Sequence, residues 1–409
     1  MATSAQRLPL GSAAGSALVA VALVVAACTS DGSRAILDST VVTITSPATT
    51  PTPPTATSRP PEPTTTVVRD RDGELHALIT GWAAEHDPVG VAAAARFPGG
   101  DMWVGAAGLA DRVTSVEIVP SDRFEISSIT KTFMAVLTLR LAEEGVIALD
   151  ETIAAYLPEF PAGQEITIRH LLGHRAGIYD PTSELVSDRN GPPDPSRVFT
   201  GDELVTAAAA GSPTFSPGSR HEYSNASYWV LASVLEAATG RDSATLLDEY
   251  LISPLGLNDT VLFDSSLPDV VVVNAYSDLD LDGEPDAMGD RPLPGYVTPA
   301  WTAGGMLSTV TDLVVFVDRL FAGEVLAPES LDAMLDTSSG GGSYALGIYR
   351  ANGLWGHDGG IKGYLSAVFH DQRTGVTVAA LTNRFGPDAP QADALAPQLA
   401  GLAREFSEP

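Results

Sequence analysis

The strand-like segments of this 409-residue chain form two groups that are far apart in the sequence. They are residues 89–96, 102–109, 344–350, 364–370 and 376–382. The first two are joined by Pro98-Gly99-Gly100-Asp101, which is typical of a hairpin turn. Helical patterns at residues 70–86 and 391–406 flank the strands, and residues 150–325 alternate helical patterns with Gly- and Pro-rich loops. We therefore expect an α/β (α+β) fold, with one antiparallel sheet built from both chain ends, flanked by helices and carrying a helical insertion lobe.

The first 68 residues have the composition of segments that lie outside a folded core. The apolar run at residues 17–27 is too short to span a bilayer permanently, and its small residues lead into Cys28, the only cysteine. This pattern is typical of a bacterial lipoprotein signal. Residues 29–68 are rich in Thr, Pro and Ser and cannot bury enough surface to offset their ordering entropy. We expect a signal peptide over residues 1–28 that ends in a lipidated Cys28, a disordered linker over 29–68, and a folded domain over 69–409. The alternative is an ordinary signal peptide with an incidental cysteine.

The net charge of the chain limits the kinds of molecule that it can bind. Its formal net charge is −28 at pH 7, whereas a protein that binds phosphate backbones needs a basic face. We therefore exclude nucleic acid as a partner. Hydrophobic residues make up 44% of the chain and charged residues 18%, which is typical of a globular protein.

Ser128 and Lys131 are the first candidates for catalysis. Lys131 and Lys362 are the only lysines among the 23 Lys and Arg residues of the chain. Arg stays protonated at any accessible pH, whereas a desolvated Lys can release its proton and act as a base. The apolar residues after Ser128 follow helical spacing up to Gly145, and residues three apart on a helix share a face. The spacing therefore predicts that the Lys131 amine reaches the Ser128 hydroxyl, which is a weak nucleophile until a base takes its proton.

Two further motifs follow in the chain, Tyr223-Ser224-Asn225 before a helical run and His357-Asp358-Gly359-Gly360 at the opening of a C-terminal strand. Together with Ser128-Ile129-Thr130-Lys131 they resemble the serine β-lactamase and D-alanyl-D-alanine carboxypeptidase superfamily, in particular its class C β-lactamase, Streptomyces-type carboxypeptidase and esterase branch. The resemblance covers about residues 74–405. It includes two stretches that look like family landmarks, residues 170–174 with Gly177 and Ala303-Gly304-Gly305-Met306. The sequence contains neither a Gly-x-Ser-x-Gly elbow nor a His-Glu-x-x-His zinc pair.

The resemblance implies a β-lactamase/transpeptidase-like fold and a role for each motif residue. Ser128 would be the acylated nucleophile and Lys131 its base partner. Tyr223 would share proton transfer to the leaving group, and Asn225 would orient the substrate amide and the lysine. His357 would hold the Tyr223 and Ser128 end of the network from its strand. A Ser-Lys-Tyr arrangement of this kind needs no metal and no other cofactor.

Residues 358–360 depart from the family pattern. The resemblance implies that the N–H groups of Ser128 and Gly360 form the oxyanion hole, with Asp358 and Gly359 beside the substrate. Family carboxypeptidases and class C enzymes usually have a hydroxyl residue at the Asp358 position and often another at Gly360, and these hydroxyls help to hold a substrate carboxylate. An Asp358 in the cleft would repel that carboxylate. The alternatives are that Asp358 points away from the cleft, or that Lys362 pairs with it or binds the substrate carboxylate itself. An esterase or amidase that acts on a neutral or cationic acyl donor is therefore a serious alternative.

An acidic segment in the last third of the chain resembles a calcium loop. Its alternating carboxylates are Asp278, Asp280, Asp282 and Asp286. Ca²⁺ binds several carboxylate oxygens, and Gly283 at the sixth place allows the sharp turn. The twelfth place is Gly289, so the bidentate Glu of such loops is missing, and a solvated acidic loop is the alternative. A bound calcium ion would be structural.

We therefore predict an exported serine hydrolase, held by a lipid anchor at Cys28 on the outer face of the bacterial cytoplasmic membrane, or secreted. It would form a Ser128 acyl-enzyme with a small-molecule or peptide substrate. Cell-wall D-Ala peptides are the expected substrates, in a D,D-carboxypeptidase-like reaction, because the linker holds the body beside the wall. Esterase or β-lactamase activity is the alternative within the same fold. The alternative from another class is a catalytically idle module that binds wall peptide.

Overall fold

The structure, a computed structural model, describes residues 69–186, 194–263, 271–278, 284–289, 293–386 and 388–407. All of these residues belong to one compact unit. Cys28 and the linker predicted over residues 29–68 lie outside the described residues, so the lipid anchor and the domain boundaries stay predictions. Within the described part of the chain, no helix is long and apolar enough to cross a membrane.

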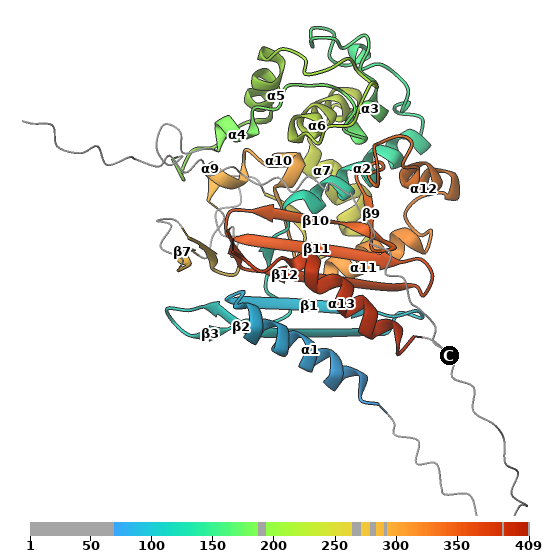
Figure 1. Ribbon diagram of the computed structural model, residues 1–409. Coiled ribbons are helices and arrows are strands. Elements are labelled where there is room, and N and C mark those ends of the chain that lie inside the picture. The colour runs from blue at the N-terminus through green and yellow to red at the C-terminus, as the bar shows by residue number, and fades with distance from the viewer. Residues whose placement is uncertain are drawn as a thin grey trace, which may run out of the picture. The chain divides into compact units, whose positions relative to one another are not determined.

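A seven-stranded antiparallel sheet in the order β3-β2-β1-β12-β11-β10-β9 forms the centre of the molecule (Figure 1). Its strands are β1 Gly90–Arg96, β2 Met102–Asp111, β3 Val116–Glu117, β9 Tyr349–Ala351, β10 Leu354–Ile361, β11 Tyr364–Asp371 and β12 Val376–Thr382. The predicted hairpin is confirmed, since β1 and β2 pair from Gly90↔Gly108 to Arg96↔Met102. β1 also pairs with β12, so strands from the two ends of the chain meet in the middle of the sheet, as predicted.

Strand β10 carries the His357 motif, which the sequence analysis expects at the opening of a strand. The strand predicted at residues 344–350 is wrong in extent, because only Tyr349–Ala351 forms β9. The motif occupies the fourth to seventh residues of β10, so it does not open the strand. Glycines weaken the alternation of apolar and polar residues that identifies a strand. Close packing against the neighbouring strand explains why position 356 is a glycine. A Cβ atom on Gly356 would lie 2.0 Å from the Val368 carbonyl oxygen of the neighbouring strand.

Two small sheets complete the strand framework. One has the order β4-β8-β5 and the other the order β13-β6-β7. Their strands are β4 Phe124–Glu125, β5 Val261–Leu262, β6 Ala275–Ser277, β7 Asp286–Gly289, β8 Met306–Ser308 and β13 Arg384–Phe385. The first of these sheets leads directly into the segment that carries Ser128.

Helices α1 (Arg71–His86) and α13 (Ala392–Arg404) cover one face of the large sheet (Figure 1). The Asp70 side chain caps the start of α1 by accepting from the Gly73 N–H at 3.1 Å. Leu75, Ile79 and Trp82, at helical spacing, are buried against the sheet. Burial of each such side chain contributes about 2 kcal/mol. Both flanking helices agree with the predicted ranges.

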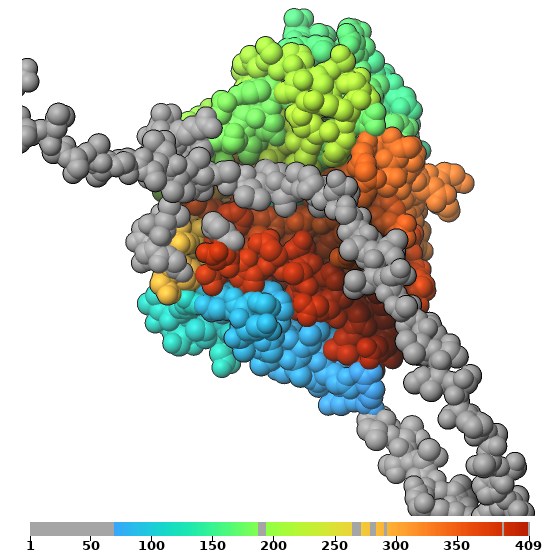
Figure 2. Space-filling model, viewed as in Figure 1, coloured from blue at the N-terminus to red at the C-terminus, as the bar shows by residue number. Residues whose placement is uncertain are grey.

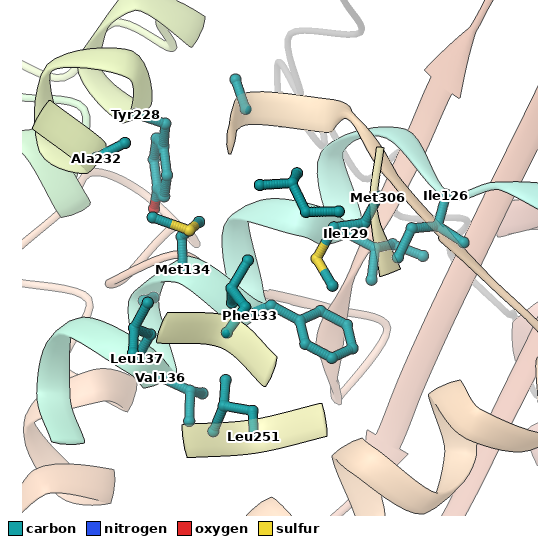
Figure 3. Packing of buried hydrophobic residues seen from close by; sticks show 14 of the residues in the cluster. Ile126, Ile129, Phe133, Met134, Val136, Leu137, Tyr228, Ala232, Leu251 and Met306 are labelled. Atoms are coloured by element: carbon teal, nitrogen blue, oxygen red, sulfur yellow. The ribbon is translucent and has the colours of Figure 1, made fainter. Parts of the chain in front are cut away.

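Helices α2 (Thr130–Glu143) and α11 (Val310–Phe321) pack on the opposite face, and their core continues into the helical lobe. Phe133 of α2 stacks on Phe316 of α11 with 3.8 Å between the ring centroids. Figure 3 shows Met134 of α2 beside Tyr228 of α6 (Asn225–Thr239), the central helix of the lobe. In the space-filling view the lobe, in green, lies above the red surface of the sheet-bearing part, and the blue surface lies farther below (Figure 2).

The remaining helices are short. They are η1 Ser127–Ile129, η2 Ile153–Ala155, α3 Ile168–Leu172, α4 Thr182–Leu185, α5 Gly201–Ala210, α7 Ser243–Leu247, η3 Asp248–Ile252, α8 Ser253–Leu255, α9 Pro294–Val297, α10 Trp301–Gly304 and α12 Pro328–Leu335. The predicted helical insertion between the two groups of strands is therefore present.

Candidate active site

Ser128 lies in η1, a single turn that leads directly into α2. The Ile126 N–H before this turn donates to the Met306 carbonyl at 2.9 Å. Ser127 has a φ angle of 49°, an unfavourable conformation for a residue with a side chain, and it turns the chain sharply. The Ser127 Oγ donates to the Gly360 carbonyl at 2.8 Å. These contacts fix Ser128 between the small β4-β8-β5 sheet and the edge of β10.

Lys131 is fully buried, and its side-chain nitrogen has three hydrogen-bond partners. Nζ lies 3.1 Å from Ser128 Oγ, 2.8 Å from Asn225 Oδ1 and 2.7 Å from the Ala303 carbonyl oxygen. The contact predicted from the helical spacing is present. Burial lowers the pKa of Lys131 from 10.5 to about 7, because the ammonium form loses its hydration, while the nearby carboxylates of Asp180 and Asp358 act against this shift.

The three partners of Lys131 indicate how the neutral amine is oriented. The Ala303 carbonyl oxygen and Asn225 Oδ1 can only accept, so they hold two N–H groups of the amine. The lone pair that remains then faces Ser128 Oγ, which carries the proton to be removed. A base with a pKa near 7 within hydrogen-bond reach of a serine is the arrangement that nucleophilic catalysis requires.

Tyr223 and Asn225 stand at the start of α6. The Ser224 side chain caps this helix by accepting from the Ser227 N–H at 3.2 Å. The Tyr223 ring centroid lies 4.7 Å from Lys131 Nζ, and its phenol shares a hydrogen bond with the Ser128 side chain. Burial raises the pKa of Tyr223 well above 10, and the hydrogen bond to Ser128 acts against this shift. Tyr223 therefore keeps its proton at neutral pH and can donate it.

His357 is buried and neutral. Burial and, to a smaller extent, the nearby Lys131 charge together lower its pKa from 6.5 to about 3. Nδ1 lies 2.5 Å from the Asp358 carbonyl oxygen and Nε2 lies 3.1 Å from the Tyr344 hydroxyl. Because a carbonyl only accepts, the ring proton is on Nδ1, and Nε2 accepts from Tyr344. The expected role of His357 at the Tyr223 and Ser128 end of the network needs a correction: its hydrogen bonds go to Tyr344 and to its own strand.

The edge of β10 beside Ser128 provides a fixed N–H group. Pairing with β9 ends at Gly356, so residues 357–361 have no outer partner strand within the described part of the chain. The Gly360 carbonyl points to this open side, because it accepts from Ser127. The N–H of an extended residue points the same way as its carbonyl. A Cβ atom on Gly359 would lie 2.8 Å from Ser128 N, which shows how closely the strand approaches. This arrangement agrees with the expected oxyanion hole of the Ser128 and Gly360 N–H groups.

Asp358 points to the sheet face that α13 covers, since strand residues alternate between faces and Leu354 of β10 packs on that side. Its Oδ1 accepts from the Tyr349 hydroxyl at 2.7 Å, and its side chain stays 34% exposed. Burial raises the pKa of Asp358, and its charge in turn contributes to a raised pKa of Asp393 in the first turn of α13. Lys362 does not pair with Asp358: its Nζ lies over the Tyr296 ring, 5.0 Å from the centroid.

The sequence analysis does not identify three residues of the site. Asp180 and Thr182 contact Asn225 from a loop that lies more than 40 residues earlier in the chain. Tyr344 is the hydroxyl partner of His357. The sequence signal for the first two is Asp-Pro-Thr, a typical turn sequence that begins three residues after the landmark Gly177.

His174, from the landmark stretch at residues 170–174, supports Tyr223. Its Nδ1 accepts from the Ser224 N–H at 3.1 Å, and its ring centroid lies 4.2 Å from that of Tyr223. Burial lowers the pKa of His174 well below 6.5, so its ring is neutral. The neutral rings of His174 and His357, with centroids 4.2 Å and 6.4 Å from that of Tyr223, add no charge to the site.

The predicted calcium loop is only partly described. Asp280 and Asp282 lie outside the described residues, whereas Asp286 begins β7 and pairs with Ser277. Among the described residues, no group of three or more His, Cys, Asp or Glu side chains is arranged to hold a metal ion. Calcium binding by Asp278 and its neighbours therefore stays a prediction.

Comparison with known proteins agrees with this geometry. A family model described as Beta-lactamase matches residues 75–402. Esterase EstB of Burkholderia gladioli is 32% identical over 329 residues, which cover 73% of this chain and 80% of the esterase. Penicillin-binding protein 4 of Amycolatopsis lactamdurans is 28% identical over 325 residues, which cover 73% of this chain and 82% of that protein. The solved structure of a D-stereospecific amidohydrolase from Streptomyces sp. superimposes with a TM-score of 0.67 at 27% identity, over 80% of this chain and 97% of its own. The chain therefore belongs to the beta-lactamase family and is a serine hydrolase with the β-lactamase/transpeptidase-like fold.

Proposed function

We propose that this hydrolase cleaves D-alanyl peptides of the bacterial cell wall, in a D,D-carboxypeptidase-like reaction through a Ser128 acyl-enzyme. The observation that carries the proposed chemistry is the 3.1 Å contact between Ser128 Oγ and Lys131 Nζ, together with a Lys131 pKa of about 7. Two relatives support a D-configured acyl donor, since one is named a penicillin-binding protein and the other a D-stereospecific amidohydrolase.

The reaction takes two steps. Ser128 Oγ bonds to the substrate carbonyl carbon while its proton passes to Lys131 Nζ, and the N–H groups of Ser128 and Gly360 bind the negative oxygen. The Tyr223 phenol donates its proton to the leaving nitrogen, which departs as an amine, and the Lys131 ammonium restores the phenol. In the second step water gives a proton to Lys131 and its oxygen bonds to the acyl carbon. The ester bond to Ser128 then breaks, and its oxygen recovers that proton.

A second candidate, an esterase or amidase for acyl donors without a carboxylate, is favoured by Asp358. At an assumed separation of about 5 Å and an effective dielectric constant of about 20, an ionised Asp358 would repel a substrate carboxylate by about 3 kcal/mol, which corresponds to roughly a hundredfold in affinity. Asp393 adds a second carboxylate on the same side of the sheet. Gly360 offers no hydroxyl to hold an anion. Esterase EstB shows that the family also includes an esterase.

We also propose that the protein is exported and anchored by a lipid at Cys28. The support is the apolar run at residues 17–27, which ends in small residues before that cysteine. Incorporation of labelled palmitate in a bacterial host, lost in Cys28→Ala, is the expected result. Equal incorporation by both proteins would contradict a lipid at Cys28.

Labelling of the purified protein with a fluorescent penicillin and with a fluorophosphonate separates the candidates. We expect both labels to be lost in Ser128→Ala, because both form a bond to the active serine. Labelling by both reagents supports the D-alanyl substrate class, and release of D-Ala from a D-alanyl-D-alanine peptide then tests it directly. Labelling by the fluorophosphonate alone supports the esterase or amidase.

Two variants at one position add a matched comparison. Asp358→Asn removes the charge, and Asp358→Thr also supplies a hydroxyl. If Asp358 repels the penicillin carboxylate, both should raise the rate of penicillin labelling, by about tenfold to a hundredfold. An unchanged rate in both variants would show that Asp358 does not act on the substrate. No labelling of the folded protein by either reagent would favour an idle binding module.

A further inference from the structure

Asp180, Pro181 and Thr182 form a turn that lies against the start of α6. The Thr182 N–H and the Thr182 hydroxyl both donate to Asp180 Oδ1, at 2.9 Å and 2.5 Å. The other carboxylate oxygen, Oδ2, accepts from the N–H groups of Asn225 and Ala226, at 2.6 Å and 3.4 Å. These N–H groups have no partner within the helix, and a negative charge is favourable at this end of it. One carboxylate therefore fixes both the turn and the end of the helix that carries Asn225.

Thr182 determines which way the Asn225 side chain faces. Asn225 Nδ2 donates to Thr182 Oγ1 at 3.3 Å, and Asn225 Oδ1 accepts from Lys131 Nζ at 2.8 Å. A hydroxyl has one proton, and Thr182 gives its proton to Asp180. Towards Asn225 the Thr182 oxygen can therefore only accept, so it selects the NH₂ group of the amide. The carbonyl group of Asn225 is then left to face Lys131.

We propose that Asp180 and Thr182 are positioning residues of this hydrolase, which hold the Asn225 carbonyl against Lys131 and so keep the lone pair of the amine directed at Ser128. With the Asn225 amide reversed, its NH₂ group would meet the N–H groups of Lys131. The amine would then lack one of its two acceptors and would turn an N–H towards Ser128. The proposal concerns acylation of Ser128 by any acyl donor, so it does not depend on the proposed substrate.

The electrostatic environment of Lys131 provides a second measurable effect. The titratable groups that face it are Asp180, Asp358, His174, His357, Tyr223 and Tyr228. Of these, Asp180 and Asp358 favour the ammonium form and so raise the pKa of Lys131. Loss of the Asp180 charge should therefore lower that pKa, and the lysine should become an effective base at a lower pH.

The chain contains a matched control for this turn. Asp194, Pro195 and Ser196 form the same structure, with the Ser196 N–H and hydroxyl donating to Asp194 Oδ1 at 2.9 Å and 2.6 Å. Neither Asp194 nor Ser196 has a hydrogen bond to Ser128, Lys131, Tyr223 or Asn225. Substitutions there change an equivalent turn without touching the site.

The test is the second-order rate constant for labelling of Ser128 by a fluorophosphonate, measured on the full chain from pH 5 to pH 10. We expect Thr182→Val, which keeps the side-chain shape, to lower the plateau rate by about tenfold or more, since misaimed catalytic groups lose rate steeply. Thr182→Ser keeps the hydroxyl and should stay within about twofold of the parent protein. Asp180→Asn should lower the plateau and shift the acid limb of the profile to lower pH.

The controls Asp194→Asn and Ser196→Ala should leave the plateau and the acid limb unchanged. A Thr182→Val protein that folds and labels at the parent rate would overturn the proposal. Equal losses in Thr182→Val and Thr182→Ser would also overturn it, because the hydroxyl would then not matter. If Thr182→Val does not fold, Asp180→Asn decides: a parent plateau with an unshifted acid limb contradicts the proposal.

Discussion

Glu125→Gln tests the effect of a buried carboxyl group close to the nucleophile. Glu125 lies on β4, three residues before Ser128, and it is 4% exposed. Its Oε2 has no hydrogen-bond partner among the described residues. Burial raises the pKa of Glu125 from 4.5 to about 8, because the carboxylate would lose its hydration without gaining a partner. At pH 7 this group is therefore protonated in the folded protein and ionised in the unfolded chain.

The sign and size of the effect follow from these two pKa values. Below pH 4.5 both states carry the proton, and the group does not oppose folding. As the pH rises the unfolded chain releases the proton first, so stability falls, and the loss is complete above about pH 8. The shift corresponds to a total loss of about 5 kcal/mol, of which roughly two thirds has occurred at pH 7. Gln has nearly the same shape and does not ionise, so the variant lacks this pH-dependent loss.

Urea titrations of the parent protein and Glu125→Gln at pH 5, 7 and 9 measure the effect. We expect the free energy of unfolding of the variant, relative to the parent, to rise by about 3 kcal/mol or more from pH 5 to pH 9. Other titrating groups are shared by both proteins and cancel in this difference. Glu117→Gln, at an exposed position on β3, is the matched control for replacing a glutamate by glutamine. The reasoning is refuted if Glu125→Gln shows the same difference at pH 5 and pH 9.

Two further predictions concern the reaction itself. The rate of Ser128 labelling by a fluorophosphonate should rise with pH through about 7, because Lys131 must be neutral to act as a base, and a limb near pH 3 would instead indicate His357. Gly359→Ala should abolish labelling, since its Cβ would lie 2.8 Å from Ser128 N, whereas Gly360→Ala meets only flexible side chains, at 3.1 Å, and should retain most of it. Similar labelling rates for Gly359→Ala and Gly360→Ala would show that β10 can shift to accommodate the added Cβ atom.

Much of the framework follows from local patterns. Alternation and the Pro98 to Asp101 turn predict the β1-β2 hairpin, because both signals lie within a few residues. Helical spacing alone brings Lys131 to Ser128. Strand β10 is harder to predict because Gly356 and Gly359 are set by close approach to neighbouring backbone, which a sequence pattern does not contain.

The electrostatic partners in the site are harder still to predict. Asp180 reaches Asn225 because a loop and a distant helix end pack together, and no periodicity links the two. The same applies to Tyr344, whose hydroxyl takes the place that Tyr223 and Ser128 were expected to occupy beside His357. Contacts of this kind depend on loop conformation, whereas residue type indicates only which groups are capable of them.

Burial also explains why a lysine and a tyrosine in the same site can act as base and acid, respectively. In water the two side chains have similar pKa values, about 10.4 for Lys and about 10 for Tyr, so neither is clearly the base. Lysine is charged when protonated and tyrosine when deprotonated, so loss of water moves the two pKa values in opposite directions. Here it lowers that of Lys131 to about 7 and raises that of Tyr223 well above 10. At neutral pH the amine can therefore accept the Ser128 proton while the phenol still has one to give. Burial of both side chains in one site, with the loss of their hydration, is therefore enough to make Lys131 the base and Tyr223 the acid.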